Sequence, residues 1–306
     1  MSRTPMLVAI GIGLVVGLVG FTTMRVHQAF EQQRRQIVHD RQAAFHSSEV
    51  FHVVGMLRLA HDGDIIAALN PLYRAVEDND HAEIVYAGEV IVNALSSEQL
   101  SQQFNEDVAW SASILIQFES KDHFEQFVAD PTMQQAVAPF DAVYWQGMKR
   151  SAIRNLMLPQ IINSRRLFRT VTFKRKIMPF IPAEIDPRRM SVREELARAS
   201  LDRGKDAIVI VNFTKDGTSA ERKADAAYLS AMLDLMSEVN NGPIHTGDSV
   251  TVEGNAEFDY VALVYYPGSG YFNDMTGSTF YQSIYTNKQV ADTQSSITVP
   301  VLHLLH

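Results

Sequence analysis

The stretch ALVYYPGSGYFNDMTGSTFYQ, Ala262 to Gln282, decides the fold class. It begins as an apolar run rich in β-branched and aromatic residues, which is typical of a buried strand. Pro267-Gly268-Ser269-Gly270 then marks a tight turn, and Ser269 is suited to cap a helix that follows. We therefore predict a central strand that exits into a helix lying back across the sheet. The inward face of this helix is predicted from its spacing to consist of Phe272, Met275, Phe280 and Tyr281.

The chain carries an earlier counterpart of this stretch. ILIQFESKDHFEQFVADPTMQ, Ile114 to Gln134, aligns with it without a gap. Two further pairs of segments are alike, 84–94 with 243–254 and 51–59 with 207–213. Repetition of a unit of about 100 residues indicates two duplicated domains rather than a solenoid.

Each copy has the pattern strand, helix, strand, strand, helix, strand. In the first copy the first helix is predicted to begin near Asn70 and Pro71, because Asn is a good N-cap and Pro suits the first turn. In the second copy the long helix is predicted over residues 219–240. Pro300 indicates that the closing strand, or part of it, lies on a sheet edge, since proline cannot donate to a ladder.

Short motifs in the second copy carry a resemblance to a known family. They are Gly247–Val250, Glu253-Gly254, Tyr266-Pro267-Gly268-Ser269 and Ser278-Thr279-Phe280-Tyr281-Gln282. This pattern resembles the dimeric α/β-barrel superfamily, and within it the DUF1330 group. The first copy keeps Phe118-Glu119-Ser120 but departs from the group at Asp130 and Met133.

The resemblance implies a fold but no reaction. It implies two tandem ferredoxin-like βαββαβ units of the dimeric α/β-barrel type, an α+β fold in which two sheets pack face to face. The superfamily includes haem enzymes and cofactor-free monooxygenases, but the sequence has no clear haem motif. Because fold does not fix function, the chemistry stays open.

The N-terminal segment has the composition of a membrane anchor. Residues 5–24 carry no charge, and their length matches a helix that crosses a hydrocarbon core. A cleaved signal peptide would usually end in a small-residue cleavage site, which is absent here. The Gly13/Gly17 pair would allow a homodimer through this helix, although glycines are common in membrane helices. Cations after the span favour a cytoplasmic folded part, so we predict a single-pass protein of a bacterial-type inner membrane in contact with the lipid bilayer.

The predicted organisation has five parts, and a basic segment separates the two repeats. The parts are a transmembrane anchor (1–24), a stalk helix (25–48), a first ferredoxin-like repeat (49–150), a basic connector (151–205) and a second ferredoxin-like repeat (206–306). The connector holds 13 Lys or Arg and 5 acidic residues. Its cations could meet anionic lipid headgroups or pair with the acidic domains. Ser191 and Glu194 fit a capping box for a helix through Leu201. The candidate surface residues are Arg165, Arg166, Arg169, Lys174, Arg175 and Lys176.

Composition excludes several kinds of chemistry. The net charge of −8 argues against a nucleic-acid binder, and the absence of cysteine excludes thiolate catalysis and Cys-based metal sites. The histidines show no metal-binding spacing, so neither a metal nor a cofactor is expected. The ligand-pocket candidates are His245, Asp248, Glu253 and Tyr281. His245 and Glu253 would share a strand face and could transfer protons, or they could be a surface residue and a turn residue.

These observations predict a membrane-anchored small-molecule-binding or assembly module. The alternative is a cofactor-independent small-molecule enzyme, of the oxygenase or isomerase type, with its pocket in the second repeat. The sequence leaves open whether the chain is an enzyme.

Overall fold

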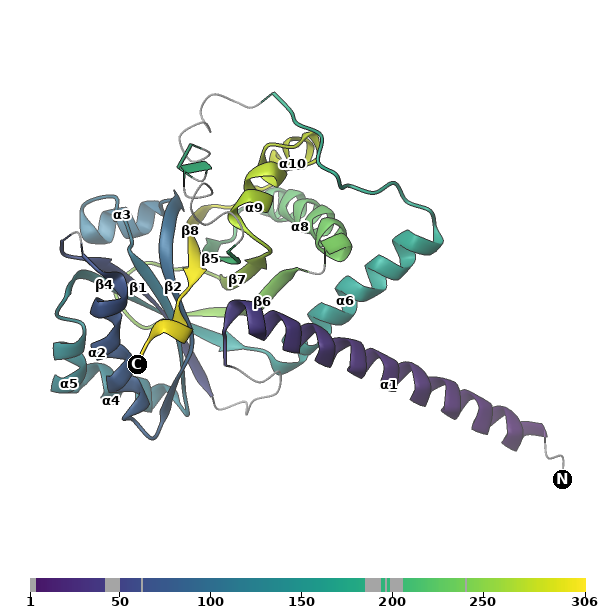
Figure 1. The fold of residues 1–306 in the computed structure, drawn as a ribbon, viewed down its shortest axis with the longest axis horizontal. Coiled ribbons are helices and arrows are strands. Elements are labelled where there is room, and N and C mark those ends of the chain that lie inside the picture. Colours follow the sequence, from purple (N-terminus) through teal and green to yellow (C-terminus); the bar gives the residue numbers. More distant parts are fainter. Residues whose placement is uncertain are drawn as a thin grey trace.

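Eight antiparallel strands form one closed barrel (Figure 1). The computed structural model describes the backbone of residues 4–41, 50–61, 63–184, 194–195, 197–198, 206–239 and 241–306. Around the barrel the strand order is β1-β3-β2-β8-β5-β7-β6-β4. The strands are β1 (Phe51–Leu59), β2 (Ala82–Leu95), β3 (Ala112–Phe118), β4 (Phe140–Arg150), β5 (Ile208–Lys215), β6 (Gly242–Thr251), β7 (Tyr260–Tyr266) and β8 (Asp292–Pro300).

The two halves of the barrel have the same strand order but do not form separate sheets. The order β4-β1-β3-β2 in the first half recurs as β8-β5-β7-β6 in the second. The predicted pair of ferredoxin-like sheets packed face to face is wrong, because β2 pairs with β8 and β4 pairs with β6. Closure gives hydrogen-bond partners to edge groups that two open sheets would leave exposed. β8 is paired on both sides along most of its length, but Pro300 pairs only with Gly88 of β2, because the ladder with β5 ends at Thr298, so the predicted edge position holds for the end of the strand alone.

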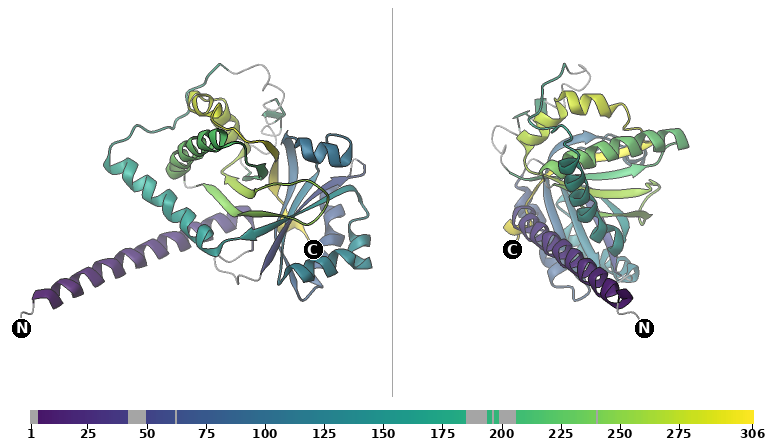
Figure 2. Two further views of the ribbon diagram at one scale, coloured as in Figure 1. Left: turned by 180° about the vertical axis from the view of Figure 1, so that it is seen from behind. Right: turned by 90° about the vertical axis from the view of Figure 1, so that its right-hand side faces the viewer.

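Helices cover the outer face of each half (Figures 1 and 2). Along β1, Val53 and Leu57 pack with the outer helices, whereas Val54 and Met56 belong to the barrel interior, as the two-residue period of a strand requires. The outer helices of the first half are α2 (Ile65–Glu77), α4 (Lys121–Ala129) and α5 (Pro131–Ala136), and those of the second half are α8 (Ser219–Val239), α9 (Ser269–Thr276) and α10 (Thr279–Tyr285).

The predicted exit from a central strand into a helix is confirmed, with two differences in detail. β7 ends at Tyr266 and α9 begins at Ser269. The residue that precedes α9 is Gly268, and Ser269 is the buried first residue of the helix rather than its cap. The predicted single helix is divided in two at Ser278, whose hydroxyl accepts a hydrogen bond from the Tyr281 backbone N–H at 3.2 Å and caps α10.

Helix α2 begins earlier than predicted. Its N-cap is Asp64, whose side chain accepts hydrogen bonds from the backbone N–H groups of Ile66 and Ala67. Pro71 therefore lies inside the helix and costs roughly 3 kcal/mol. The buried residues Ile65 and Leu69 precede Pro71, and burying each contributes about 1.5–3 kcal/mol, which offsets that cost.

Helix α1 (Thr4–Val38) corrects the predicted membrane anchor. Among the described residues, no helix has the length and apolarity needed to span a membrane. This finding contradicts the transmembrane helix over residues 5–24 and the single-pass inner-membrane location. The predicted anchor and most of the predicted stalk form one continuous helix that runs into the polar segment ending at Val38. The side chains of residues 5–12 lie outside the described part of the chain.

The segment between the two halves contains one long described helix, α6 (Ala152–Val171). Ser151 caps it by accepting a hydrogen bond from the Arg154 backbone N–H. α6 packs against α8 and also contacts α1. The helix predicted from Ser191 to Leu201 lies largely outside the described residues.

Candidate functional site

The last turn of α1 and the residues after it close one end of the barrel. Val38 is fully buried within the cluster that fills the barrel interior. The Arg41 backbone N–H donates to the Val85 carbonyl of β2 at 3.0 Å. We call this region the α1 end, and its buried ionisable residues include Arg34, Asp40, Arg150 and His245.

Strand geometry aims Arg150 and His245 into the barrel. On β4, Arg150 lies two residues after Met148, which belongs to the interior cluster. Arg150 is the register partner of Gly247 on β6, and His245 lies two residues before Gly247. Because side chains two residues apart share a strand face, both residues point inward from neighbouring strands. The side chains of Arg150 and His245 therefore meet the end of α1 inside the barrel.

A network of buried charges joins α1 to β6. Nε2 of His245 lies 2.8 Å from Oδ2 of Asp40, and neither side chain is exposed to solvent. Nη1 of Arg34 forms an ion pair with the same carboxylate oxygen, and its Nη2 lies 2.6 Å from Oε2 of Glu31. Arg34 is thus neutralised by two carboxylates, as buried arginines usually are.

Burial and neighbouring charges set the protonation of this network. Burial alone would raise the pKa of Asp40, but Arg34 and His245 outweigh it and hold that pKa well below its usual range. Burial and the positive charge of Arg150 lower the pKa of His245 to about 4, against the opposing effect of Asp40. At neutral pH an ionised Asp40 therefore faces a neutral imidazole. An ionised carboxylate can only accept, so the imidazole proton belongs on Nε2.

Arg150 differs from Arg34 because it forms no ion pair with a carboxylate of the described residues. Its Nη2 donates to the Ile244 carbonyl at 3.2 Å. Its Nε and Nη1 are buried, and neither has a hydrogen-bond partner among the described residues. Burial, with the nearby charge of Arg34, lowers the pKa of Arg150 to about 9. At neutral pH the α1 end therefore holds a charged guanidinium with two unfilled donor nitrogens.

The structure does not bring the four predicted pocket residues together. Only His245 lies at the α1 end, while Asp248 is exposed and forms an ion pair with Arg154 at 2.8 Å. Glu253 lies beyond the far end of β6, where it accepts a hydrogen bond from the Trp145 backbone N–H. It is eight positions from His245, which corresponds to roughly 26 Å along a strand. Tyr281 lies outside the barrel, beside Tyr228 of α8.

Three residues of the α1 end were not predicted from the sequence. Arg34 and Asp40 lie in the segment that was predicted to be a stalk helix, and Arg150 is the last residue of the predicted first repeat, next to the basic connector. One signal was available for Arg150, because it continues the inward alternation of β4 beyond Met148. Nothing local in the sequence indicates the pairing of Asp40 with His245.

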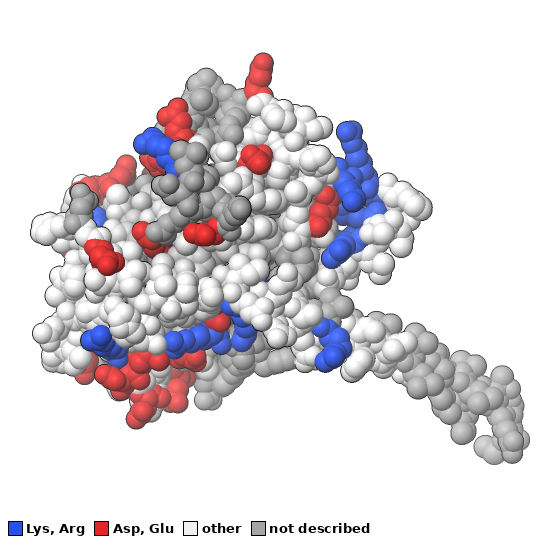
Figure 3. Space-filling model, in the orientation of Figure 1, with Lys and Arg blue, Asp and Glu red and all other residues white. Residues whose placement is uncertain are grey.

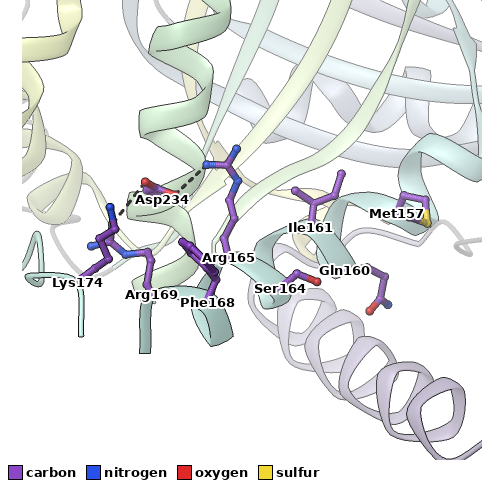
Figure 4. A pocket seen from close by; sticks show the side chains of 9 residues that line it. All are labelled: Met157, Gln160, Ile161, Ser164, Arg165, Phe168, Arg169, Lys174 and Asp234. Carbon is purple, nitrogen blue, oxygen red and sulfur yellow. Dashed lines mark hydrogen bonds and ion pairs between the residues drawn. The ribbon is translucent and has the colours of Figure 1, made fainter. Parts of the chain in front are cut away.

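A groove of about 540 Å³ runs along α6 and is lined by side chains of that helix, by Lys174 and by Asp234 of α8 (Figure 4). Nη1 of Arg165 lies 2.8 Å from Oδ1 of Asp234, and Nη2 of Arg169 lies 2.6 Å from Oε1 of Glu238. These ion pairs favour the interpretation that connector cations pair with acidic residues of the protein. Figure 3 shows Lys and Arg side chains gathered on this side of the molecule. The other four predicted surface cations, all exposed, are Arg166, Lys174, Arg175 and Lys176.

The groove beside α6 and the α1 end differ in their capacity to hold a ligand. In the groove, the arginine charges are already matched by carboxylates of α8. At the α1 end, Asp40 and His245 are engaged with Arg34 and with each other, so they are poor candidates for metal ligands. The unfilled donors of Arg150 are instead suited to an anion.

No protein-family model matches the chain, and no curated protein matches it. Among solved structures, an anthrone oxidase-like protein is 10% identical over 85% of this chain and 94% of its own, with a TM-score of 0.45. A chlorite dismutase variant from Candidatus Nitrospira defluvii is 9% identical over 84% of this chain and 94% of its own, with a TM-score of 0.44. A protein of unknown function from Rhodopseudomonas palustris is 18% identical over 39% of this chain and 97% of its own, with a TM-score of 0.32.

Similarity at this level assigns neither a reaction nor a ligand to the chain. The barrel architecture rests on the strand pairing of the chain itself, in which two four-stranded halves close into one barrel. That architecture agrees with the resemblance to the dimeric α/β-barrel superfamily. The finer likeness to the DUF1330 group stays a prediction.

Proposed function

We propose that the chain binds a small organic anion at the α1 end of its barrel, with Arg150 as the anion-binding residue. The observation that carries this proposal is the buried guanidinium of Arg150, whose Nε and Nη1 have no partner among the described residues. A buried charge without a hydrogen-bonded counter-charge is expensive. A carboxylate or phosphate group would accept from both nitrogens and remove that cost.

The charge balance at the α1 end also favours an anion. Three arginines lie at this end, Arg34, Arg35 and Arg150, against the two carboxylates of Asp40 and Glu31, and His245 is neutral. Arg150 therefore contributes a positive charge that its surroundings do not cancel. A ligand of one negative charge would bring this end of the barrel close to neutrality.

The surroundings of Arg150 favour a ligand with an apolar body. Val38, Met148 and Tyr265 belong to the interior cluster at this end of the barrel. Small-molecule sites typically combine such an apolar lining with a few fixed polar groups. Because the end of α1 covers the site, the proposal includes a shift of its last turn when the ligand enters.

Thermal unfolding of the full chain with a panel of anions tests the proposal. The probes are inorganic phosphate, acetate, succinate and benzoate, at constant ionic strength. Binding at 100 times the dissociation constant adds about 2.7 kcal/mol of stability, enough to raise the melting temperature by several degrees. Benzoate should give the largest rise, because it combines a carboxylate with an apolar ring.

Two arginine variants separate the site from general anion effects. Arg150→Met should remove the rise. Arg154 is an exposed arginine four residues away that pairs with Asp248. Arg154→Met should therefore leave the rise in melting temperature intact. The proposal fails if no anion stabilises the wild type, or if Arg150→Met is stabilised as much as the wild type.

A second candidate function is proton transfer on the bound anion. It is favoured by the pairing of a neutral His245 with an ionised Asp40, since strongly perturbed pKa values cluster at functional sites. Incubation in D2O with acetate or succinate, the two anions of the panel that carry hydrogens on the carbon next to a carboxylate, tests it by NMR. Deuterium exchange at a carbon of the ligand should occur with the wild type and be lost in His245→Gln. Equal exchange in both proteins would exclude this candidate.

A further inference from the structure

Two histidines and a glutamate converge on the surface where β2 begins, β3 ends and α4 starts. Nδ1 of His81 lies 2.8 Å from Oε2 of Glu119, and Nδ1 of His123 lies 3.9 Å from the same oxygen. One donor atom from each of the three side chains lies within 4.8 Å of the other two. The side chains are 51%, 62% and 29% exposed for His81, Glu119 and His123, so a solvated ion can reach them.

The backbone holds these residues in place. Ala82 of β2 is the register partner of Phe118 of β3, and one step further the Glu119 N–H donates to the His81 carbonyl at 3.1 Å. His123 lies in the first turn of α4, whose N-cap Ser120 directly follows Glu119. Three elements thus bring residues 38 positions apart in sequence to one point. The convergence is built by strand pairing and by a capped helix, which limits the entropy lost on binding.

The donor set and spacing suit a borderline divalent cation. Imidazole nitrogen and carboxylate oxygen bind Zn²⁺ at about 2.0–2.2 Å, which places tetrahedral ligand atoms about 3.3 Å apart. The observed separations of 2.8 and 3.9 Å lie on either side of that value. The two imidazole rings are stacked with centroids 4.1 Å apart and planes 4° apart. The lone pair of each nitrogen lies in its ring plane, so binding one ion requires the rings to rotate out of this parallel stack, which exposed side chains can do.

The surrounding charge also favours a cation. Asp80 and Asp122 are exposed and directly adjoin His81 and His123 in sequence. Lys121, the nearest cation along α4, is engaged with Glu125 at 3.3 Å. Figure 3 shows acidic side chains gathered where Figure 1 labels α4. A negative surface raises the local concentration of cations and speeds their association.

We propose that His81, Glu119 and His123 form a Zn²⁺ site with three protein ligands and an open position toward solvent. The ion would tie the start of β2 to the first turn of α4. Among the described residues, this is the one place where three such donors come so close together. The site lies apart from Arg150 and does not depend on the proposed anion binding.

Isothermal titration of the full, untagged chain with ZnCl2 in a non-chelating buffer tests the proposal. We expect one ion per chain, with affinity reduced at least tenfold in each of His81→Ala, Glu119→Gln and His123→Ala. His306→Ala and Glu125→Gln serve as matched controls for loss of an exposed histidine and an exposed carboxylate, and both should bind as the wild type does. Wild-type affinity in His81→Ala and His123→Ala, or no binding to the wild type, would overturn the site.

A measurement on the wild type alone covers the case in which a variant misfolds. Diethyl pyrocarbonate modifies accessible imidazoles, and mass spectrometry locates the modified residues. Zn²⁺ should protect His81 and His123 but leave His306 reactive. Equal modification of all three with and without the ion would contradict the proposal.

Discussion

The two ends of the barrel are closed by helices of opposite chemistry. At the α1 end, buried charges of Arg34, Asp40 and Arg150 meet the neutral imidazole of His245. At the other end, which we call the α3 end, α3 (Glu98–Phe104) covers an apolar surface. The residues buried there include Leu100, Val108, Trp110, Ala256 and Phe258.

The way each closing helix is attached differs as well. The N-terminus of α3 is fixed by Asp292, which accepts from the Ser97 hydroxyl at 2.6 Å and from the Gln99 backbone N–H at 3.2 Å. This carboxylate lies where the dipole of a helix favours a negative charge. α1 is fixed instead by buried ion pairs, which often stabilise a protein less than apolar residues of the same volume would. The α3 end therefore suits a structural role, and the costly α1 end suits a functional one.

The largest expected effect comes from removing the buried negative charge of Asp40, which acts on both Arg34 and Arg150. Asp40→Asn should destabilise the chain by about 3–5 kcal/mol, because it leaves buried cations uncompensated. Urea unfolding at pH 7 measures this change. At the α3 end, Asp292→Asn removes a partly exposed helix cap and should cost only about 1 kcal/mol. Equal costs at the two ends would remove the contrast between them.

The next effect is a dependence on pH that originates at the α1 end. The pKa of His245 is lowered to about 4 from an ordinary 6.5. Between these values the unfolded chain binds more protons than the folded chain, so this stability is present above pH 6.5 and is lost as pH falls toward 4. The loss amounts to about 3 kcal/mol. Urea unfolding at pH 7.5, 5.5 and 4.5 should show it in the wild type.

The same unfolding series on variants assigns the pH dependence to one end. His245→Gln should show a shallower loss of stability with acid. Trp110→Ala at the α3 end should lower stability by about 3–5 kcal/mol at every pH and keep the wild-type slope. If His245→Gln keeps the wild-type slope, the assignment to His245 is wrong.

A stabilising substitution sharpens the contrast further. Arg150→Met replaces an unpaired buried cation with an apolar side chain of similar length. It should raise the free energy of unfolding by about 1–4 kcal/mol, as replacements of buried charges often do. Urea unfolding at pH 7 without added anion gives the value. A destabilised Arg150→Met would mean that Arg150 has a structural role, which would weaken its assignment to a ligand.

The smallest effect is expected just outside the α1 end. Arg154 and Asp248 form an exposed ion pair at 2.8 Å. Pairs of this kind contribute about 0–1 kcal/mol, and salt screens them. Arg154→Met should therefore change stability by less than about 1 kcal/mol, and the change should shrink further in high salt. Urea unfolding measures this change. A larger loss of stability would mean that the functional region extends beyond the buried charges.

The sequence predicts what local patterns determine and misses what distant pairing determines. β7 and the long helix α8 were predicted closely because strand composition and helical spacing are local signals. Barrel closure was not predicted, because the ladder between β2 and β8 joins residues that lie far apart in sequence, such as Gly88 and Pro300. The order of strands within each half does not reveal whether its edge strands stay unpaired or pair with the edge strands of the other half.

The candidate site was predicted only in part for a related reason. His245 attracted interest as a histidine on a predicted strand, but its partner Asp40 lies in a segment rich in Arg, Gln and Glu. Such a segment is normally solvated, because charged residues are rarely fully buried unless paired. The pairing that buries Asp40 exists only once the end of α1 meets β6. No pattern along the chain contains that information.

The most direct test of the central claim, that Arg150 receives an organic anion at the α1 end, is isothermal titration calorimetry with benzoate. The account predicts one benzoate per wild-type chain, binding at least tenfold weaker in Arg150→Met, and unchanged binding in Arg154→Met. Binding of equal affinity to the wild type and Arg150→Met would contradict the account. So would the absence of binding by benzoate and by each of the other three anions of the panel.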